Sequence, residues 1–170
     1  MNASNRSAGE RYVVGVDVGT GSARAGIFDT AGNMAASAKK DITLFHESGG
    51  IVEQSSGEIW SAVCHAVKAA LAQAAIAPES VAGISFDATC SLVVLGDGGK
   101  PLPVGPSEQA ERDIVVWMDH RAIGQAERIN ATGHAVLKYV GGRISPEMET
   151  PKLLWLLEVM LSLVSPSRRL

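Results

Sequence analysis

The stretch YVVGVDVGTGSARAGIFD, residues 12–29, contains two β-like runs separated by one short turn. Residues 12–18 are rich in β-branched side chains, and residues 23–28 resume an apolar pattern. Between them stand small and hydroxyl residues: Gly19, Thr20, Gly21 and Ser22. This pattern predicts a strand, a tight turn and a second strand. One carboxylate, Asp17, lies where the first strand should end.

The composition of this turn is typical of a phosphate-binding loop. Glycines let backbone N–H groups approach an anion closely, and the hydroxyls of Thr20 and Ser22 add further donors. Asp17 is a hard oxygen ligand that can hold Mg²⁺ directly or through water, and Arg24 adds positive charge. The alternative is an ordinary hairpin turn with Asp17 as its polar shoulder, because short glycine motifs often occur by chance. No Gly-Lys-Ser/Thr follows, so this is not a Walker loop.

Composition and charge limit the class of protein. The chain has 170 residues, 46% apolar and 19% charged, which is enough for one domain with a core. A net charge of -3 and a pI near 5.8 give no electrostatic footprint for nucleic acid or an anionic membrane. With only two cysteines, Cys64 and Cys90, we expect no disulfide framework and a cytoplasmic location. A homodimer is left open.

The rest of the pattern predicts an α/β domain with a mixed sheet. Further strands are expected at residues 34–44, 81–86, 92–95 and 113–117, and residues 45–52 are interpreted as a loop. Helices are expected at residues 57–75, 122–129 and 131–140, with a terminal helix through residue 157. Residues 1–11 are interpreted as a flexible lead-in and 158–170 as an atypical or truncated tail.

The clearest helix is the one at residues 57–75. We expect Ser55 or Ser56 to cap it, with Glu58 as the partner in a capping box. Apolar residues at spacings of three and four predict one buried face: Ile59, Trp60, Val63, Cys64, Val67, Ala70 and Leu71. If this helix is a crossover connection, the buried strand at residues 81–86 runs parallel to the first strand.

Two polar segments follow predicted strands. Asp87, Ala88 and Thr89 come directly after residues 81–86, at the sheet end where ligands of α/β proteins gather. Asp119 and Arg121 follow the strand at residues 113–117. The structural interpretation of the second segment is a helix start with Asp119 as N-cap. That interpretation leaves the functions of Trp117, Asp119 and Arg121 open.

Taken in order, these motifs resemble the N-terminal part of an FGGY-family carbohydrate kinase. Residues 15–24 match the family pattern Asp-x-Gly-Thr-x-Ser-x-Arg, residues 83–90 occupy its sugar-contact strand end, and residues 115–121 are similar to its Trp-x-Asp-x-Arg segment. The resemblance covers residues 12–157. It implies a ribonuclease-H-like fold of the actin, Hsp70 and sugar-kinase superfamily, present here in incomplete form.

Within the family, the chain is most similar to the D-ribulose kinases. Glycerol kinases carry an Arg-Glu pair where this chain has Ala88 and Thr89, which argues against glycerol as the substrate. The strings at residues 87–94 and 145–152 resemble ribulokinase-type members. Small side chains at positions 88 and 89 leave room for a linear ketopentose, and the Thr89 hydroxyl can hydrogen-bond to it.

The resemblance implies in-line transfer of the ATP γ-phosphoryl group to a sugar hydroxyl. Asp17 would lie near Mg²⁺. The turn at residues 19–22, together with Arg24, would steady the phosphates. On the sugar side, the resemblance implies roles for Asp87, Ala88, Thr89, Trp117, Asp119 and Arg121. The general base and a second, nucleotide-binding domain are expected beyond Leu170, so the 170-residue chain alone should be inactive.

Two other interpretations stay open at this point. One is a neighbouring superfamily branch, such as an acetate-kinase-like or hexokinase-like protein, although the segment from Trp117 to Arg121 counts against it. The other is a non-catalytic domain, either a sugar- or nucleotide-binding module or a folded remnant without activity. The expected partner is a small-molecule sugar, and we expect no nucleic acid or membrane partner.

Overall fold

The computed structural model describes residues 10–164, which form two compact units. Unit 1 comprises the described residues through Thr43 together with Gly57–Thr89. Unit 2 comprises Leu44–Ser56 and the described residues from Cys90 onward. Most of the predicted lead-in and the last part of the predicted tail, residues 165–170, lie outside the described residues.

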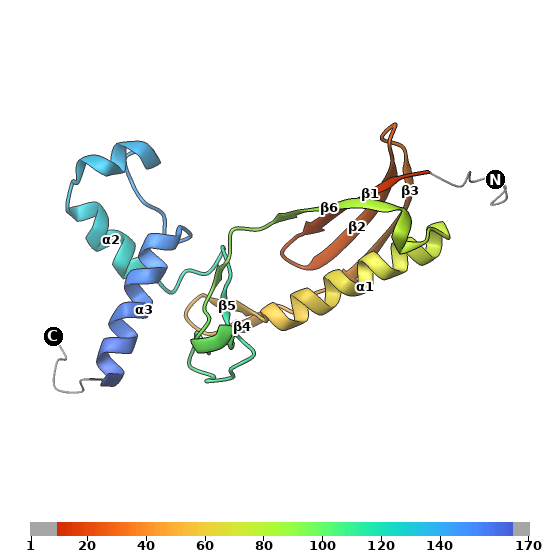
Figure 1. The fold of residues 1–170 in the computed structure, drawn as a ribbon. Helices are drawn as coiled ribbons and strands as arrows, with labels where there is room; N and C mark the ends of the chain where they lie inside the picture. Colours follow the sequence, from red (N-terminus) through yellow and green to blue (C-terminus); the bar gives the residue numbers. More distant parts are fainter. Residues whose placement is uncertain (1–9, 165–170) are drawn as a thin grey trace. The chain divides into compact units, whose positions relative to one another are not determined.

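Unit 1 is built on a four-stranded mixed sheet (Figure 1). Its strands are β1 (Tyr12–Val18), β2 (Ser22–Asp29), β3 (Met34–Asp41) and β6 (Val81–Ala88). The order across the sheet is β3-β2-β1-β6, with antiparallel β1–β2 and β2–β3 pairs and a parallel β1–β6 pair. The structure therefore confirms the predicted hairpin and the return of residues 81–86 parallel to the first strand.

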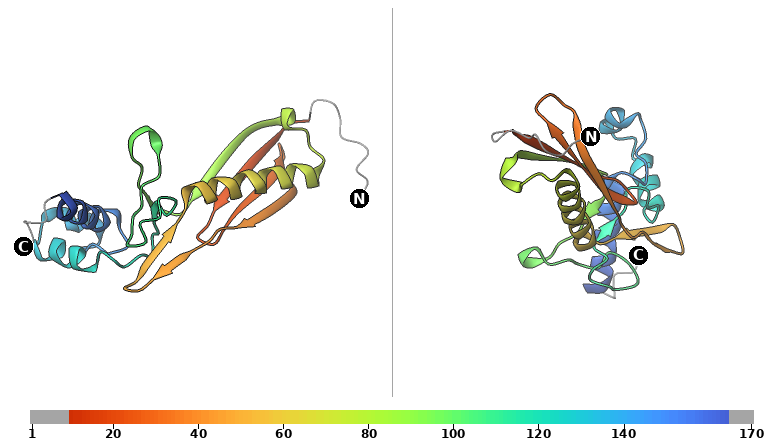
Figure 2. Two further views of the ribbon diagram at one scale, coloured as in Figure 1. Left: turned by 90° about the horizontal axis from the view of Figure 1, so that it is seen from below. Right: turned by 90° about the vertical axis from the view of Figure 1, so that its right-hand side faces the viewer.

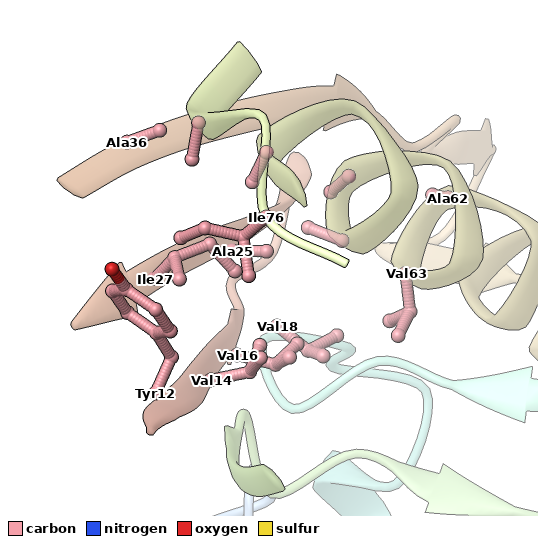
Figure 3. Packing of buried hydrophobic residues seen from close by; sticks show 14 of the residues in the cluster. Tyr12, Val14, Val16, Val18, Ala25, Ile27, Ala36, Ala62, Val63 and Ile76 are labelled. Carbon is pink, nitrogen blue, oxygen red and sulfur yellow. The ribbon is translucent and has the colours of Figure 1, made fainter. Parts of the chain in front are cut away.

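Helix α1 (Ser56–Ala74) lies along one face of this sheet, as the two views of Figure 2 show. Alternate residues of β1 and β2 point toward it, and its small residues allow close approach (Figure 3). The fully or nearly fully buried members include Val14, Val16, Ala23, Ile27, Ala66 and Ala70. Of the predicted apolar face, Val63 and Ala70 are buried and Ile59, Val67 and Leu71 pack against the core, whereas Cys64 is half-buried and Trp60 is 63% exposed.

Residues distant in sequence contribute to the start of α1. Asp113 accepts hydrogen bonds from the Ser56 N–H (2.8 Å) and hydroxyl (2.5 Å). The carboxylate of Glu58 accepts bonds from the Thr43 N–H and hydroxyl. Both partners are distant in sequence, so a pattern of near neighbours could not reveal them.

Strand β6 is exposed, which contradicts the predicted burial of residues 81–86. Ile84 and Phe86 are each 50% exposed. Their register against Val14 and Val16 places them on the face that α1 covers at β1 and β2. Because β6 is the outermost strand of this sheet, the apolar run that resembles a buried strand is only half covered here.

Unit 2 contains a second sheet of four short strands. Their order is β4 (Phe45–Glu47), β5 (Ile51–Gln54), β8 (Ile114–Val115) and β7 (Leu92–Val93), all antiparallel. The interpretation of residues 45–52 as a loop is therefore wrong. Gly49 and Gly50 both have positive φ, at 79° and 78°, and they turn the chain between β4 and β5.

The helices of unit 2 are α2 (Ile123–Ala131) and α3 (Glu149–Val164), with a 3₁₀ helix at Ala135–Val140 in place of the predicted α-helix. Asp119 does not cap α2: the N-cap position is Ala122, without a side-chain bond. Helix α3 begins just before Pro151, as predicted, and continues to Val164, beyond residue 157. Among residues 10–164, no helix has the length and apolar character needed to cross a bilayer.

Candidate functional site

Three charged side chains meet at one end of the unit 1 sheet. Asp17 is the register partner of Arg24 on β2 and of Asp87 on β6. Arg24 Nη1 donates to Asp17 Oδ2 at 2.8 Å, and the two side chains are 58% and 52% exposed. Because β1 and β6 are parallel, Asp17 and Asp87 lie side by side near the carboxyl ends of both strands. The structure thus brings these predicted residues together.

The turn after β1 is held by its own backbone. The Gly19 N–H donates to the Ser22 carbonyl at 3.0 Å, and the Gly21 carbonyl accepts from the Ile42 N–H at 3.0 Å. Neither Gly19 nor Gly21 has a left-handed φ, and a Cβ at Gly21 would meet nothing within 4 Å. Backbone conformation therefore does not explain why residue 21 is a glycine, whereas close approach of a ligand to the backbone would explain it. Ser22 is 4% exposed, so Thr20 and Gly21 form the more accessible part of the turn.

An open concavity of about 430 Å³ lies on the sheet face opposite α1. Asp17, Arg24 and Asp87 line it, together with apolar and small residues of the strands. Phe28 forms part of its wall and lies against the glycines of β1 and β2. A Cβ at Gly26 would come within 2.8 Å of the Phe28 ring, so the ring can occupy this place only over glycine.

The end of β6 continues the pairing with β1. The Thr89 N–H donates to the Val18 carbonyl at 3.1 Å, and the Ala88 N–H donates to its neighbour Asp87 at 3.0 Å. Ala88 is exposed and Thr89 is half-buried. Asp87 and Ala88 therefore belong to β6, which continues two residues beyond its predicted end, and Thr89 follows directly beside the end of β1.

The second predicted group lies in unit 2 and is buried. Arg121 Nη2 donates to Asp119 Oδ2 at 2.8 Å and to Glu53 Oε1 at 2.9 Å. The side chains of Glu53 and Asp119 are 0% exposed, and that of Arg121 is 2% exposed. We call Glu53, Asp119 and Arg121 the buried ion cluster. Its geometry fits structural support of the strand end, so direct sugar contact by Asp119 and Arg121 stays a prediction.

Backbone groups add further hydrogen bonds to the buried ion cluster, although Glu53 Oε2 has no hydrogen-bond partner among the described residues. Asp119 also accepts from the Val52 N–H at 2.7 Å, and Arg121 Nη1 donates to the Val104 carbonyl. Gly105 lies directly against Glu53, because a Cβ at residue 105 would be 1.9 Å from Glu53 Oε1. Glu53 was not among the predicted site residues. The signal that could have found it is a carboxylate directly after the apolar pair Ile51 and Val52.

Lys152 is a second residue that the sequence did not single out. It is 0% exposed, and Nζ donates at 2.9 Å to the carbonyls of Val116, Trp117 and Glu147. Burial lowers the pKa of this lysine, while the nearby carboxylates, Glu149 foremost, act in the opposite direction. Trp117 is half-buried, and its N–H donates to Ser91 Oγ at 3.1 Å.

The donors at the unit 1 sheet end suit a hard cation. Among the described residues, no group of three or more histidine, cysteine or acidic side chains could hold a metal ion alone. Mg²⁺ usually takes one or two carboxylates and completes its shell with water and substrate phosphates. Asp17, with Asp87 beside it, meets that requirement. The two predicted groups belong to different units.

Solved structures define the fold. A gluconate kinase from Lactobacillus acidophilus matches with a TM-score of 0.73 at 23% identity, covering 92% of this chain and 30% of that one. A xylulose kinase from Rhodospirillum rubrum matches with a TM-score of 0.73 at 22% identity, covering the same shares. The fold is therefore that of these solved sugar kinases.

The chain belongs to the FGGY family of carbohydrate kinases, whose N-terminal domain matches residues 12–163. A protein of Saccharomyces cerevisiae named D-ribulokinase is 48% identical over 148 residues, which cover 86% of this chain and 21% of the relative. A human protein named FGGY carbohydrate kinase domain-containing protein is 48% identical over 149 residues, which cover 88% of this chain and 27% of the relative. The chain thus spans about a quarter of the length of these relatives.

Proposed function

We propose that this chain is the N-terminal part of a kinase that transfers the γ-phosphoryl group of ATP to a pentulose, with D-ribulose as the best candidate. The observation that carries the proposal is the meeting of Asp17, Arg24 and Asp87 at the parallel ends of β1 and β6, beside an open concavity. In a sugar-kinase fold, this is the end of the sheet where ligands gather.

The residues of unit 1 would bind and orient phosphate. The exposed Asp17–Arg24 pair contributes little to stability because solvent screens it. Arg24 can therefore leave Asp17 and donate to phosphate oxygens at small cost. The accessible part of the turn, Thr20 and Gly21, would contact the same phosphates. Asp17, with Asp87, would hold Mg²⁺, which neutralises phosphate charge when bound.

The substrate class rests on the end of β6 and on the relatives. Ala88 is exposed and Thr89 is half-buried, so position 88 presents a small side chain and position 89 a hydroxyl. A site that hydrogen-bonds to a sugar hydroxyl rejects sugars that cannot form this bond, because its polar group would then stay unpaired. The similarity to the yeast protein named D-ribulokinase supports D-ribulose. Trp117 of unit 2 would contact the sugar, with Asp119 and Arg121 supporting it from the interior.

The test is an ATP-consumption assay of the full-length gene product against a panel of pentuloses, pentitols and glycerol. We expect D-ribulose to give the highest kcat/KM, and we expect no turnover from the 170-residue chain alone. Turnover of glycerol or xylulose without D-ribulose would overturn the substrate assignment. Failure of every sugar alongside measurable ATP or sugar binding would favour a binding module instead. A cytoplasmic location and a homodimer stay predictions.

A further inference from the structure

Lys152 buries an ammonium group against three main-chain carbonyls. Nζ lies 2.9 Å from the oxygens of Val116, Trp117 and Glu147, and these three acceptors match the three N–H donors of a charged lysine. The residue is 0% exposed, so water cannot replace any of these bonds. A buried cation is costly unless its partners are complete, which makes this arrangement specific to lysine.

The three carbonyls tie two segments together. Val116 and Trp117 follow β8, and Glu147 precedes α3. The Val116 carbonyl also accepts from the Asp119 N–H at 2.9 Å, so the same atom joins Lys152 to the turn that carries the buried ion cluster. On its other side, the Trp117 N–H donates to Ser91 Oγ. The main chain of Trp117 is therefore held at both its N–H and its carbonyl.

We propose that Lys152 is a positioning residue for sugar binding: it fixes the main chain of Trp117 and thereby the direction of the indole. The inference rests on the proposed function, in which Trp117 contacts the sugar. Lys152 itself touches no ligand. Loss of Lys152 should therefore weaken sugar binding, because a small displacement of the contact group Trp117 weakens binding steeply. ATP affinity should stay unchanged.

The protonation of Lys152 can be changed by pH, which gives a test that needs no substitution at position 152. The groups that face it are the carboxylates of Glu147, Glu149 and Asp119 and the guanidinium of Arg121. Burial lowers the pKa of Lys152 below the ordinary lysine value of 10.5. Loss of the proton leaves two N–H donors for three carbonyls, so the Trp117 main chain should loosen at alkaline pH.

The first experiment compares Lys152→Met with Lys138→Met in the full-length gene product. Lys138 is an exposed lysine of the same unit, so the control makes the same chemical change outside the interior. We expect Lys152→Met to raise the KM for D-ribulose on the order of tenfold with an unchanged KM for ATP, and Lys138→Met to change neither. An unchanged KM for D-ribulose, or an equal rise in both KM values, would overturn the proposal.

The second experiment needs no activity and no stable variant at position 152. The 170-residue chain is labelled with 5-fluorotryptophan, which reports on its three tryptophans, Trp60, Trp117 and Trp155. Substitution of Trp60 or Trp155 by phenylalanine assigns the ¹⁹F resonances. We expect the Trp117 resonance to shift with a midpoint below pH 10.5 while Trp60 does not follow it. Where Lys152→Met folds, this shift should disappear.

An unmoved Trp117 resonance would overturn the inference about Lys152. Absence of D-ribulose turnover in the wild-type gene product would instead overturn the proposed function. The two failures are therefore distinguishable.

Discussion

The two units each contain a carboxylate and an arginine 2.8 Å apart, in opposite environments. In unit 1, Asp17 and Arg24 are 52% and 58% exposed beside a concavity. In unit 2, Asp119 and Arg121 are 0% and 2% exposed, and further hydrogen bonds surround them. An exposed pair can exchange its partner for a ligand, whereas a buried pair cannot. The same two residue types therefore form an exposed pair in one unit, to which we assign ligand binding as a proposal, and a buried pair in the other.

The largest expected effect is loss of stability on removal of the buried cation. Arg121→Met leaves Glu53 and Asp119 buried without their partner, and we expect the free energy of unfolding to fall by about 3 to 5 kcal/mol. Arg24→Met, the matched change in unit 1, should cost less than about 1 kcal/mol. Urea unfolding of the two variants, followed by tryptophan fluorescence, measures both. Equal losses in the two variants would remove the distinction between the units.

A smaller effect is expected from adding one methyl group at a glycine. Gly105→Ala places a Cβ against the Glu53 carboxylate and should cost about 1 to 3 kcal/mol. Gly21→Ala meets no atom and should change stability by less than about 0.5 kcal/mol.

Gly21→Ala should nevertheless weaken ATP binding by the full-length gene product if the turn cradles phosphate. Isothermal titration with ATP measures this, and Gly83→Ala is the control, because a Cβ at Gly83 also meets nothing within 4 Å and Gly83 pairs with Val13 at the other end of β1. Unchanged ATP affinity in Gly21→Ala would favour the alternative interpretation, in which the turn is an ordinary hairpin.

The smallest effect concerns pH. A side-chain hydrogen bond from Asn33, followed by its backbone N–H, lowers the pKa of Asp29 from its usual 3.8. A lowered carboxyl pKa stabilises the folded chain above 3.8, and this contribution is lost as pH falls through the folded-state pKa. Asn33→Ala should move the pKa of Asp29 toward 3.8. An NMR titration of the Asp29 carboxyl carbon measures the shift, and an unmoved pKa would contradict the assigned cause.

Local patterns predicted most of unit 1. Alternating apolar residues around the turn at residues 19–22 specify the hairpin, and spacings of three and four specify α1. These signals lie within a few residues, so the sequence alone carries them. The exposure of Phe86 could not be read in the same way, since it depends on which elements cover the edge of the sheet.

Unit 2 was predicted less well because its contacts connect distant residues. Glu53 and Arg121 are 68 positions apart, and Lys152 reaches back 36 positions to Val116. From the sequence, Asp119 before a helix is a reasonable N-cap, but its carboxylate instead binds Arg121 and the Val52 N–H. The sequence thus located the residues of the candidate site but could not tell exposed charges from buried ones.

The most direct test of the distinction between the units is Asp17→Ala in the full-length gene product, with Asp41→Ala as the control. Asp41 is also an exposed carboxylate of this sheet and pairs with Lys39 at 2.9 Å. We predict that Asp17→Ala lowers kcat with D-ribulose at least about a hundredfold and changes the free energy of unfolding by less than about 1 kcal/mol. Asp41→Ala should keep full activity. Wild-type turnover from Asp17→Ala, or an activity loss matched by unfolding, would contradict the assignment of phosphate chemistry to unit 1.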